Sequence, residues 1–206
     1  TATVLSFGSF VLLTTVLLAL FLTIVNYLEA PQVSSRVKKA AEVLCALSSL
    51  LLIGYVGVFL QSIWTVPFWS SYAIPALFVL SSVSLGMALM FLVTSFSSSI
   101  EWLNRRMVQL HIGHVTTLLL EAVALAVLVA QSTLNATALR SLDLLFGPDL
   151  QLWFVVGALG FGIALPLVAE LYSILSKKVL LLPAAQILCL LGGFCLRYCI
   201  VSAGVH

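Results

Sequence analysis

Solid blocks of apolar residues alternate with short polar breaks along the whole chain. Six blocks are long enough to cross a bilayer, because a helical span needs roughly 20 apolar residues. They cover residues 4–27, 41–61, 74–96, 107–131, 152–175 and 179–203. The blocks lack the alternation of membrane β-strands. The pattern therefore predicts an all-α integral membrane protein, a six-transmembrane-helix bundle in a single domain of residues 1–206.

Composition supports this class. Of the 206 residues, 62% are hydrophobic and 8% are charged, whereas soluble domains carry about 25% charged residues. The longest break, 133–151, has room for a small surface element but not for a domain, so a soluble redox or catalytic module would have to come from a partner. The first block begins close to Thr1 without a preceding basic region, and we expect either a processed chain or a fragment of a longer protein.

Basic residues in the breaks predict the orientation. The first, third and fifth breaks hold seven of them: Arg36, Lys38, Lys39, Arg105, Arg106, Lys177 and Lys178. The second and fourth breaks together hold only Arg140. Since positive loops stay in the cytoplasm, both termini are predicted on the outer, periplasmic side of the inner membrane. An aromatic belt is predicted at that outer boundary from Trp64, Trp69 and Tyr72.

The cysteines and histidines argue against a cofactor held by this chain itself. All four cysteines lie in predicted spans without a C-x-x-C pair, and we interpret them as packing residues: Cys45, Cys189, Cys195 and Cys199. His111 and His114 lie near the cytoplasmic start of the fourth span, and His206 lies at the opposite face. No two of them lie on different helices at similar depth, as axial haem ligands usually do, so we expect no haem, flavin or metal here. No basic stripe with interleaved aromatic residues predicts nucleic-acid binding.

Several ionisable and polar residues fall inside the predicted spans, where such groups are costly unless they are used or paired. Glu121 lies seven residues after His114 and therefore on the same helical face. Groups spread over the depth of the bilayer are what a proton path needs, and the predicted path comprises Ser81, Ser84, His114, Glu121, Glu170 and Arg197. Structural alternatives stay open: a neutral, hydrogen-bonded Glu121, an interfacial Glu170, a snorkelling Arg197 and serines that serve only packing.

Small residues and one proline predict the helix contacts of the last two spans. The three glycines of 157–162 and the pair Gly192-Gly193 permit close helix packing. Pro166 has no N–H to donate to the carbonyl of Gly162. A kink with a free backbone acceptor is predicted there.

Short motifs in order resemble the polysulfide reductase/nitrite reductase membrane-subunit family (NrfD/PsrC type). They are Ser6-Phe-Gly-Ser9, Gly54-Tyr-Val-Gly57, Val66-Pro-Phe-Trp69, Pro75-Ala-Leu-Phe-Val-Leu-Ser-Ser82 with Gly86, and Leu191-Gly-Gly-Phe-Cys-Leu-Arg-Tyr198. Glu121 is similar in place to a Glu that the family often has in its sixth helix. The order of the motifs matches the third to eighth helices of the family's eight-helix fold. The six spans thus resemble its C-terminal part.

The resemblance implies a membrane anchor and quinone-linked subunit of a respiratory oxidoreductase complex, with proton translocation as a further expectation. Electrons would pass between quinol and iron–sulfur clusters in a partner protein, beside a catalytic subunit. This chain would bind no cofactor itself. The family's quinol site is formed largely by its first helices, which have no counterpart here. We therefore expect quinone or menaquinone at a boundary with additional transmembrane helices or another subunit.

Two other classes are weighed against this interpretation. Six helices permit a small secondary transporter built from two inverted three-helix repeats, but residues 1–97 and 107–206 show no internal repeat. An intramembrane protease needs a nucleophilic Ser and a His on another helix, and the histidines are confined to one usable helix. We expect another polypeptide to cover the lateral surface of spans one to three. The grounds are small or polar residues, which mark helix contacts: Ser81, Ser82, Ser84 and Gly86 in the third span, with Gly8 and Ser9 in the first.

Overall fold

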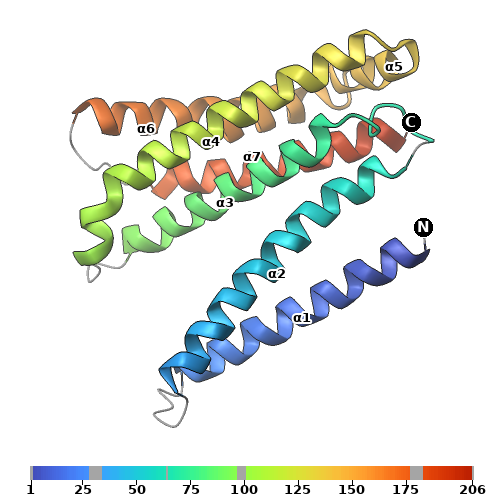
Figure 1. Ribbon diagram of the computed structural model, residues 1–206. Helices are drawn as coiled ribbons and strands as arrows, with labels where there is room; N and C mark the ends of the chain where they lie inside the picture. The colour runs from blue at the N-terminus through green and yellow to red at the C-terminus, as the bar shows by residue number, and fades with distance from the viewer. Residues whose placement is uncertain (1, 28–33, 64, 97–100, 177–182, 206) are drawn as a thin grey trace.

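Eight helical elements follow one another in the part of the chain that the structure describes. The computed structural model describes residues 2–27, 34–63, 65–96, 101–176 and 183–205. Its elements are α1 (Ala2–Tyr27), α2 (Ser35–Gln61), α3 (Ala73–Phe96), α4 (Glu101–Thr133), α5 (Ala136–Leu145), η1 (Leu152–Ala164), α6 (Leu165–Ser176) and α7 (Pro183–Val205) (Figure 1). Six spans are long and apolar enough to cross a membrane. The predicted all-α, six-span membrane fold is confirmed.

The fifth span and the break before it depart from a plain α-helix. The span runs from Leu152 to Leu175 and begins as the π-helix η1, which continues into α6. The break before it holds α5, which confirms the expected small surface element. Asn135 starts α5, because its side-chain oxygen accepts hydrogen bonds from the backbone N–H and the hydroxyl of Thr137.

The helices form a bundle with a hairpin at its side. In the bundle, α7 packs on η1, α3 and α6, while α4 packs on α3, α5 and α6. Helix α1 packs on α2, and α2 in turn packs on α3 (Figure 1). Glycines permit close approach at both contacts. Between α1 and α2, Gly8 lies against the ring of Tyr55. Between α2 and α3, a Cβ atom on Gly57 would lie 2.6 Å from the Cα atom of Pro75.

The predicted close packing of the last two spans is confirmed at a backbone crossing. A Cβ atom on Gly192 of α7 would overlap the backbone of Gly162 of η1. A Cβ atom on Gly157 would lie 2.8 Å from the sulfur of Cys195. The predicted free acceptor is confirmed as well, because the carbonyl of Gly162 receives the thiol of Cys189, at 3.8 Å.

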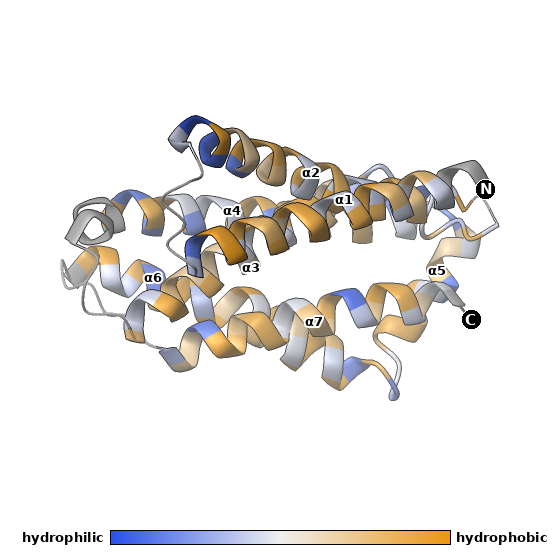
Figure 2. Cartoon of the chain, turned by 90° about the horizontal axis from the view of Figure 1, so that it is seen from below, coloured by the Kyte–Doolittle hydropathy of each residue, from blue (hydrophilic) through white to orange (hydrophobic). Residues whose placement is uncertain are grey.

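Hydrophobic residues predominate along the middle of the helices, and hydrophilic residues gather at the start of α2 (Figure 2). The chain ends that Figure 1 marks lie at one end of the molecule, as an even number of spans requires. One prediction for this end is wrong. Trp69 does not belong to an aromatic belt: it is buried against Gly204, and its indole N–H donates to the carbonyl of Ile200 at 3.0 Å. Tyr72 is exposed, and Trp64 lies outside the described residues.

Candidate functional site

A carboxylate on α6 lies between two histidines of α4. The Nδ1 atom of His114 is 3.0 Å from Oε1 of Glu170, and the Nδ1 atom of His111 contacts Oε2. The side-chain amide of Gln186, in the first turns of α7, donates to Oε1 at 3.2 Å. These four side chains are buried, with exposed fractions of 0–4%. They form a polar cluster, which we call the His–Glu cluster, where α4, α6 and α7 meet.

The directions of the hydrogen bonds follow from the chemistry of the groups. An ionised carboxylate only accepts, so each histidine that bonds to Glu170 donates through an Nδ1–H. The Nε2 atom of His114 is then an acceptor in the neutral ring, and the Ser84 hydroxyl of α3 lies 3.2 Å from it. Phe91 of α3 stacks on the ring of His111, with centroids 4.7 Å apart and an interplanar angle of 13°. The cluster therefore joins α3, α4, α6 and α7.

A second group of polar side chains lies further along the bundle. Glu121 of α4 is buried, and Arg197 of α7 is near enough to act on its carboxyl group electrostatically. The guanidinium group of Arg197 donates to the hydroxyl of Ser82 on α3, at 2.6 Å. Ser81 lies beside Glu121, but its hydroxyl meets no hydrogen-bond geometry with a described residue. We call these residues the Glu–Arg group.

Three small polar side chains occupy the depth between the two groups. His114 and Glu121 are seven residues apart, or about 10 Å along a helix. Thr117, on the same face of α4, is buried and donates to the carbonyl of Gly113 at 2.8 Å. The Cys189 thiol of α7 neighbours Ser84, and the charges of both Glu121 and Glu170 act on it. A run of polar atoms thus extends from Arg197 to the His–Glu cluster without a direct bond between His114 and Glu121.

The structure brings the sequence-predicted site residues into these two groups. Among the described residues, His114 bonds to Ser84 and Glu170, whereas Glu121 lies beside Ser81 and within the electrostatic reach of Arg197. Sequence reasoning missed Gln186, Ser82 and Cys189 as members. The available signal was helical spacing: Gln186, Cys189 and Arg197 differ by three and eight positions, which puts them near one face of α7.

The polar face of the third span does not support the expected cover by another polypeptide. That face contacts this chain itself, because Ser84 meets His114 of α4 and Ser82 meets Arg197 of α7. Ser81 is buried at 1% exposure. Gly86 is exposed and has no atom within 4 Å of where its Cβ would be. The serines serve intramolecular contacts, because their partners on α4 and α7 are costly polar groups that need hydrogen bonds inside the bundle.

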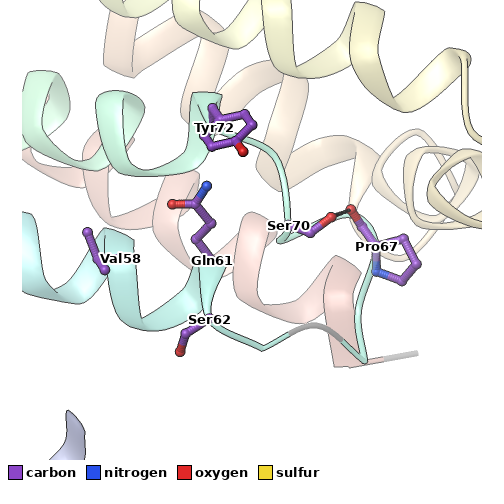
Figure 3. A pocket seen from close by; sticks show the side chains of 6 residues that line it. All are labelled: Val58, Gln61, Ser62, Pro67, Ser70 and Tyr72. Carbon is purple, nitrogen blue, oxygen red and sulfur yellow. Dashed lines mark hydrogen bonds between the residues drawn. The ribbon is translucent and has the colours of Figure 1, made fainter.

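A pocket of about 580 Å³ opens at the opposite end of the molecule from the His–Glu cluster, where α2 ends. Its lining residues are Val58, Gln61, Ser62, Pro67, Ser70 and Tyr72. Figure 3 shows the amide of Gln61 extending towards Tyr72 across this space. A neighbouring pocket of about 220 Å³ shares Pro67, Ser70 and Tyr72 and reaches Gln131 and Asn135. Hydroxyl and amide groups beside apolar walls suit a small ligand with hydrogen-bonding oxygens.

The described residues contain no group of three or more histidine, cysteine or carboxylate side chains arranged to hold a metal ion. The four cysteines are unpaired thiols. His206, the third histidine, lies outside the described residues. That this chain binds no cofactor of its own stays a prediction.

Comparison with known proteins identifies the family. The family described as polysulphide reductase, NrfD, matches residues 2–206. No curated protein and no solved structure matches the chain. The match extends over nearly the whole chain and all six spans. This multi-pass membrane chain belongs to the polysulphide reductase NrfD family, whose members are membrane subunits of respiratory oxidoreductases.

Proposed function

We propose that this chain is the quinone-linked membrane subunit of a respiratory oxidoreductase complex in an inner membrane, with both termini on the periplasmic side. It would pass electrons between quinol and an iron–sulfur partner and carry protons through its helix bundle. The observation that carries the proposal is the family match over residues 2–206. The chain offers titratable groups for protons, while the electron carriers would belong to the partner and to the quinone.

The pocket at the end of α2 supports a quinol site at this end of the molecule. A quinol head has two hydroxyl groups, and Gln61, Ser70 and Tyr72 supply amide and hydroxyl partners around the pocket. Val58 and Pro67 give apolar walls for a ring and the start of its tail. The head would lie beside the α2–α3 boundary, close to the side on which additional helices are expected.

The run of polar atoms inside the bundle supports proton transfer. Quinol oxidation releases two protons, which need titratable or hydrogen-bonding groups to cross an apolar interior. The Glu–Arg group lies towards the pocket end, and the His–Glu cluster lies where α4 and α7 begin and α6 ends. Protons would pass between the two through Ser84, Cys189 and internal water, since ordered water joins polar groups that are too far apart for direct bonds.

The hairpin of α1 and α2 supports a further transmembrane partner. Both helices expose large apolar side chains, among them Phe10 at 71% and Leu51 at 59%. Their only extensive contact with the bundle among the described residues is the one between α2 and α3. Additional helices or a separate subunit would pack here and complete the quinone pocket, with lipid on the remaining faces.

Purification of the native complex tests this function. A chain with an affinity tag, extracted in mild detergent, should carry with it an iron–sulfur protein and a catalytic oxidoreductase subunit, and the preparation should oxidise a quinol. A chain that purifies alone and moves a solute in liposomes would instead establish the secondary-transporter alternative. The family match does not favour that alternative.

A further inference from the structure

Glu170 is a buried carboxylate without a fixed cation to neutralise it among the described residues. The groups that act on it are His111 and His114, each of which is charged only when protonated. Arg197, the partly buried cation of α7, acts on Glu121 instead. Among the described groups, an ionised Glu170 with two neutral imidazoles would leave one uncompensated negative charge in an apolar interior, which is strongly unfavourable. A proton on the cluster itself removes that charge.

Three N–H donors keep the carboxyl group itself ionised. The Gln186 amide donates to one oxygen atom, and with an Nδ1–H on each ring His111 and His114 donate to both. A protonated carboxyl group would need one histidine to give up its Nδ1 hydrogen and accept instead. The extra proton is therefore placed on an imidazole Nε2 atom, and the two rings differ in what faces that atom.

The Nε2 atoms of the two rings have different surroundings. The Nε2 atom of His111 is buried and has no hydrogen-bond partner among the described residues. A buried N–H without a partner is unfavourable. The Nε2 atom of His114 faces the Ser84 hydroxyl at 3.2 Å. That hydroxyl donates to a neutral ring and, after rotation, accepts from a protonated one.

We infer that the His–Glu cluster stores one exchangeable proton on the Nε2 atom of His114, with Ser84 as the group that adapts its hydrogen bond to each state. Binding adds one proton to Nε2, leaves Glu170 ionised and turns the Ser84 hydroxyl from donor to acceptor. No other bond changes. The role of this proton in coupled turnover rests on the proposed function. The protonation of His114 itself does not depend on that function.

The groups around His114, which holds the stored proton, come from α3, α4, α6 and α7. They are Ser84 and Phe91 of α3, Glu170 of α6 with His111 of α4 on its other oxygen, Gln186 of α7 on Glu170, and Cys189 of α7 beside Ser84. Ser84 also neighbours Cys189, which feels the charge of Glu121. Rotation of the Ser84 hydroxyl therefore changes the hydrogen bonding on the side of His114 that is nearer to the Glu–Arg group. The adjacent Cys189 offers a polar next contact in that direction.

Nitrogen NMR of the full chain in lipid bilayers tests this inference directly, because the sequence has only three histidines. With 15N-labelled histidine, an imidazolium shows two protonated ring nitrogens and a neutral ring shows one. We expect His114 to be imidazolium and His111 to be neutral with its hydrogen on Nδ1. Assignment uses His111→Gln and His206→Gln. Two neutral buried rings, or an imidazolium at His111, would overturn the inference.

Two variants test whether the proton on His114 depends on Glu170 and Ser84 rather than on the burial of the ring alone. Glu170→Gln removes the charge that requires the proton, and His114 should then become neutral. Ser84→Ala removes the adaptable partner, and His114 should also lose its imidazolium signal, while Ser82→Ala, on the other polar group, should leave it unchanged. An imidazolium that persists in Glu170→Gln would contradict the inference. Because the spectra involve no quinol, they give the same result whether or not the proposed function holds.

Discussion

The Nδ1 atom of His114 lies 3.0 Å from Oε1 of Glu170 and joins α4 to α6 inside the bundle. This contact makes an acidic residue near the end of the fifth span a structural partner of the fourth. Glu170 contacts His111 as well, so one carboxylate satisfies two buried rings. Removal of the carboxylate should therefore cost stability as well as alter proton handling.

Glu170→Gln should lower thermal stability in detergent. The amide of Gln can accept from one histidine but presents an N–H to the other, and the unmatched donor pair costs roughly 1–3 kcal/mol. Asp143→Asn is the matched control, because Asp143 is an exposed acid on α5. Thermal unfolding followed by circular dichroism measures both. Equal midpoints for the two variants would show that the cluster adds no stability.

Gly192→Ala should disturb the fold, because a Cβ atom there overlaps the backbone of Gly162 and neither helix has a flexible side chain to move. Overpacking of this kind costs about 1–3 kcal/mol or more. Gly86→Ala and Gly54→Ala are matched controls, since nothing lies within 4 Å of their Cβ positions. Yield of monodisperse protein and its thermal midpoint check the difference. A Gly192→Ala variant as stable as the controls would refute the close crossing.

Labelling of an introduced, exposed cysteine should establish the orientation, because Cys189, Cys195 and Cys199 are buried. Lys39 at the start of α2 and Thr137 in α5 are both exposed and lie at opposite ends of the bundle. In a background without Cys45, a membrane-impermeant maleimide applied to spheroplasts should label Thr137→Cys at once. It should label Lys39→Cys only after the membrane is made permeable. The reverse pattern would place both termini in the cytoplasm.

Changes in the pocket at the end of α2 should weaken quinol use without loss of assembly. In the purified complex, Gln61→Ala and Tyr72→Phe each remove one hydrogen-bonding group from its lining. Each should raise the KM for quinol several-fold, since a lost hydrogen bond is worth about 0.5–1.5 kcal/mol. Tyr172→Phe is the control, because Tyr172 is exposed on α6 beside a different groove. An unchanged KM in both pocket variants would move the quinol site elsewhere.

The sequence was sufficient for the spans, because the apolar blocks are long and the polar breaks are clear. It also predicted the Gly192 crossing and the free carbonyl of Gly162, since both follow from small residues and a proline at known positions. The sequence did not predict which polar residues contact one another. Helical spacing puts His114 and Glu121 on one face, but α6 and α7 decide which group each meets. Trp69 shows the same limit: its burial depends on Gly204, far away in the sequence.

The ratio of protons moved to electrons transferred, in proteoliposomes of the complex, tests the central claim most directly. Glu121→Gln keeps the shape of the buried Glu121 side chain but removes its titration, next to Arg197 and Ser81. The account predicts that the variant complex assembles with all subunits and moves fewer protons per electron than the wild type, or turns over quinol more slowly. An assembled variant with the full ratio and full turnover would show that Glu121 is structural and that the polar run does not carry protons.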